Sequence, residues 1–451
     1  MNIARLKQNL FSPSEKLQMK YTLWMNHLLV VYAFLLPISV QARAQVQFAI
    51  IILFFLRGNF KKYIFEHLKN PIVIAFALYF SLYILWLFGS DNPHYASMLI
   101  KHNKYAFFFP IIILSFIDKR FTSKVVSGFL IGIFFSEIAS YLVSLHIISP
   151  SLSIYNVKIF HPYMSVYDPS PFMLHTKYGL ALALAISLLL HNILTQKYTI
   201  IQKAISIFFL FSITFNISIT GGRIGYILFV ILILTLIILV FKKNSIKAFL
   251  ISIASISIVF FIAYSNSTIF KNRIDYSISS ISSLYKNPMN FNSSFGKRVG
   301  MWYYGGKVLK EHPIFGVGTG DHVDMIKEKI KDEHSNFKAV VHPHNQLVSV
   351  FIQFGIIGVL IFLNIFYSIF KYKKYASSYH KNIAILSSLS IFFMWMIEGD
   401  KVKFTLPLLI TLVSISLANK QYNNFHINKN KKITILYIII ALLAFILAFF
   451  I

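Results

Sequence analysis

Two histidines on either side of a proline are the sharpest candidates for chemistry in this sequence. They stand in the run His342-Pro343-His344-Asn345, which leads into a long apolar segment. An imidazole at a membrane–water boundary can act as a general base, because its ordinary pKa lies close to neutral pH. For either histidine alone, a purely structural role at the interface is an equally good interpretation.

A pair of glycines follows these histidines. Nine residues separate Asn345 from the run Gly355-Ile356-Ile357-Gly358, about two helical turns into the apolar segment. Small residues at such spacing allow two membrane helices to approach closely. We therefore interpret the glycines as a packing motif.

Two arginines are candidates for binding an anion. Arg223 ends the run Thr220-Gly221-Gly222-Arg223, where a tight turn precedes an apolar segment, and Arg298 lies one helical turn before Trp302. The planar guanidinium matches phosphate oxygens, and a helix N-terminus adds partial positive charge. The alternatives are an interfacial arginine whose charge reaches water and an arginine on a solvated helix face.

The acidic residues and the missing motifs limit the chemistry further. Glu398 and Asp400 could orient a cation or be solvated, and Glu137 stands alone inside an apolar segment. We find no Asp-x-Asp pair, no clustered carboxylates and no His-x-x-x-His pair, so a divalent metal site is not predicted. The sequence has no cysteine, no P-loop and no dinucleotide fingerprint, so no cofactor is predicted and ATP use is not expected.

The elements that must position these residues are apolar helices. Apolar runs long enough to cross a bilayer recur along the whole chain, and we predict an all-α polytopic membrane protein with about 12–13 transmembrane helices. The candidate spans lie near residues 23–41, 45–56, 71–88, 105–117, 125–148, 176–192, 199–219, 223–241, 246–264, 346–370, 382–397, 402–418 and 433–451.

The strongly basic balance, a formal charge of +28, fits the same picture. Lys and Arg gather in alternate connections between spans, as expected for cytoplasmic loops of a membrane protein. This pattern predicts a cytoplasmic N-terminus, contact with membrane lipids and no nucleic-acid partner. It also places His344, Arg223 and Arg298 together on the opposite, external side.

The chain divides into three parts on this basis. Residues 1–264 hold the N-terminal spans, residues 265–341 form one large external loop, and residues 342–451 hold the C-terminal spans. Within the loop we predict a helix over 293–311, a flexible turn over 316–320 and a second, amphipathic helix over 321–337.

Together these motifs resemble those of the O-antigen ligase family, within the wider group of lipid-linked-glycan ligases and polymerases. The family is usually drawn with one span fewer than the thirteen predicted here. Three matches carry the resemblance: His344-Asn345 with Gly355-x-x-Gly358, then Thr220-Gly221-Gly222-Arg223 with Gly222 where the family usually has Ser, and finally Arg298 and Trp302 followed by Pro313-Ile314-Phe315-Gly316-Val317-Gly318.

The resemblance implies a membrane glycosyltransferase of the GT-C type with a helical periplasmic loop. Such an enzyme moves a glycan from undecaprenyl pyrophosphate to a sugar hydroxyl of lipid A–core, without metal, at the periplasmic face of the bacterial inner membrane. His344 would be the base, and Arg223 and Arg298 would bind the donor pyrophosphate. Asn345, His342 and Trp302 would support them.

Other functions remain open at this point. An O-antigen polymerase or a protein O-oligosaccharyltransferase of the same family would differ in its acceptor. A transporter of lipid-linked glycans would also be polytopic and basic, but transporters more often show repeats and mid-membrane charges, and here only Glu137 qualifies. A scaffold for other membrane enzymes would not need His344 and two arginines on one side.

Overall fold

The structure is a computed structural model that describes residues 13–154, 157–241, 245–333, 335–372, 377–399 and 402–417. Each predicted span before residue 418 corresponds to a helix, whereas the predicted span 433–451 lies outside the described residues. Eight helical stretches of the described chain are long and apolar enough to cross a membrane. The predicted all-α, polytopic class is confirmed.

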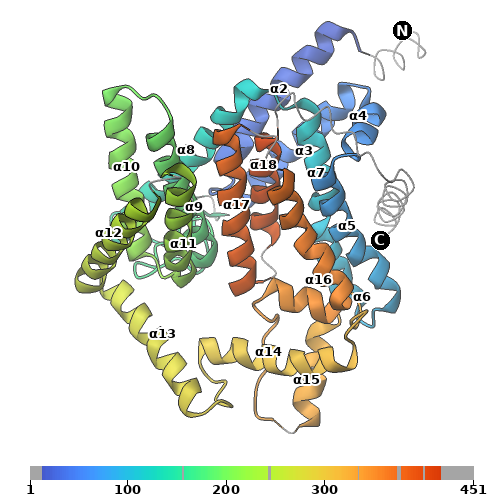
Figure 1. Cartoon of the computed structure of the whole chain (residues 1–451), viewed down its shortest axis with the longest axis vertical. Coiled ribbons are helices and arrows are strands. Elements are labelled where there is room, and N and C mark those ends of the chain that lie inside the picture. The colour runs from blue at the N-terminus through green and yellow to red at the C-terminus, as the bar shows by residue number, and fades with distance from the viewer. Residues whose placement is uncertain are drawn as a thin grey trace.

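The helices that correspond to predicted spans form the upper body of the molecule in Figure 1. They are α2 (Glu15–Leu35), α3 (Val40–Leu56), α5 (Pro71–Leu85), α7 (Tyr105–Phe116), α8 (Lys119–Ser144), α9 (His175–Thr195), α10 (Ile200–Ile219), α11 (Arg223–Phe241), α12 (Ser245–Asn266), α16 (Gln346–Tyr372), α17 (Ser378–Ile397) and α18 (Val402–Ser416). Short elements complete the described chain: α4 (Phe60–His67), η1 (Trp86–Gly89), α6 (Pro93–Asn103) and a small hairpin of β1 (Ser153–Ile154) and β2 (Val157–Lys158).

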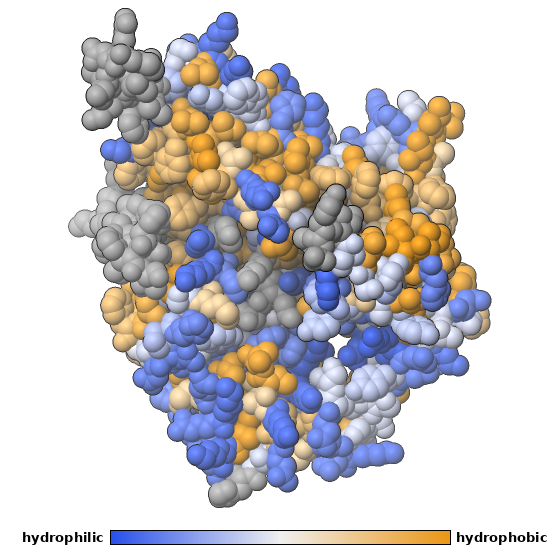
Figure 2. All heavy atoms as spheres, turned by 180° about the vertical axis from the view of Figure 1, so that it is seen from behind, coloured by the Kyte–Doolittle hydropathy of each residue, from blue (hydrophilic) through white to orange (hydrophobic). Residues whose placement is uncertain are grey.

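The packing of the helices separates a protein core from a lipid-facing surface. Helix α9 is mostly buried and packs against α11, whereas α10 and α12 are largely exposed despite being apolar. Figure 2 shows apolar side chains gathered in a broad band across the upper half of one face, with hydrophilic side chains above it at the top and over most of the lower end. An exposed apolar surface of this kind suits lipid chains as its neighbours.

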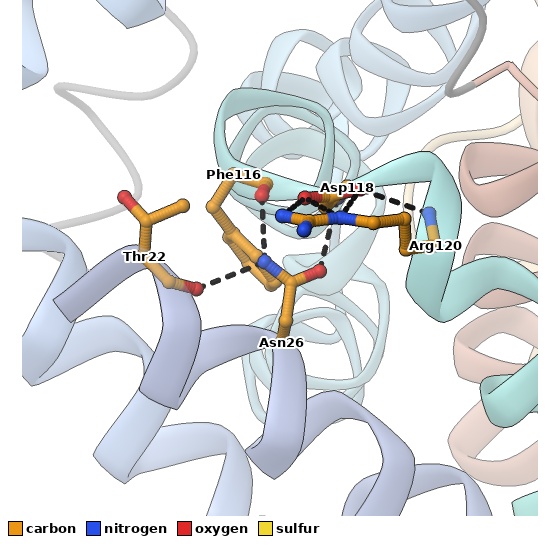
Figure 3. A network of polar contacts seen from close by, with 5 residues as sticks. All are labelled: Thr22, Asn26, Phe116, Asp118 and Arg120. Carbon is orange, nitrogen blue, oxygen red and sulfur yellow. Dashed lines mark hydrogen bonds and ion pairs between the residues drawn. The ribbon is translucent and has the colours of Figure 1, made fainter. Parts of the chain in front are cut away.

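A buried asparagine fixes one end of the bundle. The Asn26 side chain of α2 donates to the Phe116 carbonyl at 2.8 Å and accepts from the Asp118 amide at 3.0 Å (Figure 3). These groups belong to the turn between α7 and α8, and Asp118 also caps α8 and pairs with Arg120. Asn26 thus satisfies backbone groups that both helix ends would otherwise leave unpaired.

The acidic residue inside a span has a partner on a neighbouring helix. Glu137 of α8 is buried, and the Ser212 hydroxyl of α10 donates to its Oε1 at 2.5 Å. This contact links α8 to α10 inside the bundle.

The long connection, residues 265–341, contains more helix than predicted. Helix α14 (Ser294–Glu311) confirms the first predicted loop helix, and α15 (His322–Asp332) is shorter than the predicted 321–337. Helix α13 (Thr268–Lys286) is polar, follows α12 directly and was not predicted. The predicted number of loop helices is therefore wrong, because the described part of this connection holds three helices rather than two.

Gly355 breaks α16, which was not predicted. Gly355 has φ 62° and ψ −159°, a conformation open essentially to glycine alone. The turn that includes Gly316 lies against this break, so that the Val317 and Gly318 amides donate to the Ile352 and Gln353 carbonyls, each at 3.0 Å. The turn over 316–320, predicted to be flexible, is instead hydrogen-bonded to the broken helix.

We predict that Gly355→Ala destabilises the protein. An alanine here would cost roughly 1–3 kcal/mol in backbone strain, and its Cβ would lie 2.0 Å from the Ile314 carbonyl oxygen. Gly306→Ala is the control, because Gly306 lies inside α14 with open space around it. Thermal unfolding of the purified protein in detergent should show a lower Tm for Gly355→Ala only, and equal Tm values would contradict the strain argument.

Candidate functional site

A buried carboxylate joins two of the predicted site residues. Glu398, which follows α17, lies 3.1 Å through Oε1 from Nδ1 of His344 and 2.9 Å through Oε2 from the Arg298 guanidinium. Its side chain is only 5% exposed. The sequence analysis left open whether Glu398 orients a cation or is solvated, and the structure supports the first role.

A side chain of α14 also holds the backbone of the turn that carries the two histidines. Trp302 lies one helical turn after Arg298, and its indole N–H donates to the Pro343 carbonyl at 2.8 Å. The His344 amide donates to Nδ1 of His342 at 3.1 Å, and the two imidazole rings lie 4.0 Å apart between centroids. His344 itself adopts φ 54°, so this turn presents its side chain in an uncommon backbone conformation.

Asn345 has an identifiable structural task. Its side-chain oxygen accepts from the Val348 amide at 3.1 Å, which caps the first turn of α16. The residue after it, Gln346, donates to the hydroxyls of Tyr79 and Tyr83 on α5. These contacts fix the start of α16 and therefore the position of His344.

Arg223 lies at the start of α11 and faces a cavity of about 300 Å³. Its guanidinium donates to the hydroxyls of Ser277 at 3.1 Å and Ser294 at 3.4 Å. The cavity lining is His175, Thr176, Gly221, Arg223, Ile224, Ile227, Arg273, Ser277, Ile281, Phe295, Arg298, Trp302, Met396 and Ile397. Arg223 and Arg298 thus share one cavity, and His344 is connected to it through Glu398 and Arg298.

A third arginine, which was not predicted from the sequence, lies at this cavity. Arg273 of α13 lines it, and a Cβ at Gly221 would lie 2.8 Å from the Arg273 guanidinium. Glycine at position 221 therefore leaves room for Arg273 beside the turn that leads to Arg223. A lone arginine in a polar segment gave no signal in the sequence.

A second histidine–carboxylate pair at the cavity was also missed. Nδ1 of His175, the first residue of α9, lies 2.7 Å from Oδ2 of Asp168. Burial raises the pKa of Asp168, but the His175 contact, the Ser170 hydroxyl and the Gly221 amide together lower it below its usual range. The carboxylate is thus held ionised beside His175.

One group of donors at this site could hold a metal ion. Ligand atoms of His342, His344 and Glu398 lie within 4.8 Å of one another. No metal site was predicted from the sequence, because it has no clustered carboxylates and no His-x-x-x-His pair on the external side, and Glu398 lies far from both histidines in the chain. Arg298 already contacts one oxygen of Glu398, so a metal ion would share this carboxylate with a guanidinium.

Comparison with known proteins identifies the central part of the chain. The family model described as O-antigen ligase matches residues 207–363, a segment that contains Arg223, Arg298, Trp302 and His344. No curated protein matches the chain.

Proposed function

We propose that this chain is a member of the O-antigen ligase family, whose model matches residues 207–363, and that it transfers O-antigen from undecaprenyl pyrophosphate to lipid A–core. The observation that carries this proposal is the shared cavity of Arg223 and Arg298, coupled to His344 through Glu398. Glycosyl transfer from a lipid diphosphate needs cations for the leaving group and a base for the acceptor hydroxyl. This site offers both without a resident cofactor.

The arginines would act on the donor. Arg223 contacts the Ser277 and Ser294 hydroxyls and the Tyr276 ring, and no ion pair with a carboxylate is found for it among the described residues, so its charge can serve phosphate oxygens in the cavity. Arg298 would bind the donor with one edge of its guanidinium while the other contacts Glu398. Fixed cations aimed at the developing charge lower the barrier to departure of the diphosphate.

His344 would act on the acceptor. With Nδ1 held by Glu398, its Nε2 is the atom left to take the proton of an attacking sugar hydroxyl. A carboxylate behind the ring both orients it and stabilises the imidazolium that forms. His342 and Trp302 would support this base by fixing the turn that carries it.

We further propose that this site faces the periplasm and that the protein resides in the inner membrane. The Lys- and Arg-rich connections fall on the side opposite to His344 when the N-terminus is cytoplasmic. Both substrates would then enter laterally from the outer leaflet, and apolar residues of the cavity such as Ile227 and Met396 would contact the isoprenoid chain.

We predict that deleting this protein leaves lipopolysaccharide with a bare core, while long glycans accumulate on undecaprenyl pyrophosphate. A gel profile of lipopolysaccharide and analysis of lipid-linked glycans check this result. Core capped with one repeat unit would instead identify a polymerase. Normal lipopolysaccharide with an unglycosylated protein would identify a protein O-oligosaccharyltransferase, and donor lipid trapped on the cytoplasmic side would identify a transporter.

We predict that His344→Asn lowers the transfer rate by about 10²- to 10⁴-fold, the usual cost of losing a positioned base. Asparagine tolerates the positive φ of this position, so the turn should persist. The rate is measured with purified donor lipid and core acceptor, and His312→Asn on the exposed end of α14 is the control. We expect a milder loss for His342→Asn, and a near-normal rate for His344→Asn would remove His344 from the mechanism.

We predict that transfer survives EDTA. Arg298 already supplies positive charge to Glu398 at 2.9 Å, and Arg223 supplies it to the donor, so a divalent ion is not needed for either task. The purified enzyme is assayed with chelator and then with added Mg²⁺, Mn²⁺ or Zn²⁺. Loss of activity that one of these ions restores would assign the cluster of His342, His344 and Glu398 as a metal site.

A further inference from the structure

We propose that His175, held by Asp168, is the proton donor to the departing diphosphate, and the proposal rests on the transfer reaction inferred above. His175 lines the same cavity as Arg223, Arg273 and Arg298. His344 does not line it and is reached only through Glu398 and Arg298. The cavity thus has its own titratable group, separate from the base.

The orientation of His175 leaves one nitrogen for a ligand. Nδ1 faces Asp168 at 2.7 Å, so Nε2 is the atom available to the cavity, and it is a donor only when the ring is protonated. Asp168 is fixed in turn, because its Oδ1 accepts from the Ser170 hydroxyl at 2.8 Å and from the Gly221 amide at 3.4 Å. The His175–Asp168 pair is therefore held in place before any ligand binds.

Close backbone packing brings His175 to this place. A Cβ at Gly222 would lie 2.5 Å from the His175 carbonyl oxygen, and Gly179 and Gly225 meet where α9 passes α11. These glycines allow the first turns of α9 and α11 to touch, so His175 and Arg223 begin neighbouring helices at one cavity. A larger residue at position 222 would push them apart.

The charges around His175 favour an anionic ligand. The groups that face this region are Asp168 from the loop before α9, Arg223 and Tyr226 from α11, Arg273 from α13 and Arg298 from α14. Within the described residues, the cavity lining contains three arginines and no carboxylate. A diphosphate would neutralise this excess charge and would lie within reach of His175.

The proton balance of the step is simple. The bond between the anomeric carbon and the phosphate oxygen breaks, and its electron pair stays on that oxygen. The acceptor oxygen bonds to the anomeric carbon and gives its proton to His344, while His175 gives its Nε2 proton to the released phosphate. Water then reprotonates His175 and removes the proton from His344.

A binding experiment without chemistry tests the site. Farnesyl diphosphate is titrated into the purified full-length protein at pH 6 and pH 8, with wild type, His175→Gln, Asp168→Asn and the exposed control His312→Gln. We expect His175→Gln to weaken binding about tenfold at pH 6, where a charge-assisted hydrogen bond is lost, and much less at pH 8. Asp168→Asn should give the same pattern with a smaller loss, and His312→Gln should match wild type.

The outcomes separate this inference from the proposed function. Equal affinity of wild type and His175→Gln at both pH values would overturn the role of His175, even if O-antigen transfer is established. A loss of affinity that is the same at both pH values would also overturn it, because it would indicate a structural role. The expected pH-dependent loss in a protein that fails the deletion test would support the diphosphate site while refuting the proposed acceptor.

Discussion

The buried charge of Glu398 is the constraint on which the rest of the site depends. The Glu398 side chain is only 5% exposed, and burying an ionised carboxylate costs free energy unless cations and hydrogen-bond donors surround it. Arg298 and His344 meet this requirement from two segments that lie far from Glu398 in the sequence. The long connection must therefore fold back onto the end of α17. Because Trp302 lies on the same helix as Arg298, this arrangement also places its indole against the histidine turn.

This constraint also explains why α16 is irregular. A regular helix would collide with the turn that follows α14. Gly316 of that turn lies close to the backbone of Gln353, and Gly355 of α16 lies close to the backbone of Ile314. The break at Gly355 frees backbone groups, and the amides and carbonyls of the opposing turn satisfy them. Non-helical backbone at membrane depth is tolerated only where protein or a cavity covers it, which is the case here.

The parts that sequence could predict are those that depend on local composition. Apolar length predicted the helices, and the motif positions of Arg223, Arg298 and His344 predicted residues that the structure links through one cavity and Glu398. Arg273 could not be predicted, since one arginine in a polar helix is usually solvated. The pairing of His175 with Asp168 depends on how a proline-containing loop folds, and no periodic sequence pattern predicts the conformation of such a loop. Gly355 and Gly358 were assigned to helix packing, because a glycine that breaks a helix and a glycine that allows close helix contact look the same in a sequence.

The clustered positive charge of the cavity favours ligands that carry or develop negative charge. Three arginines that share a small cavity repel one another, and the positive ends of α9 and α11 add to this field. Within the described residues, only Arg298 of these three arginines has a carboxylate partner, whereas Arg223 donates to two serine hydroxyls. A neutral sugar gains little from such a field, whereas a diphosphate gains more as negative charge develops on it. In the proposed transfer, such a site would stabilise the leaving group most strongly after the glycosidic bond has begun to break, which is the condition for catalysis rather than for binding alone.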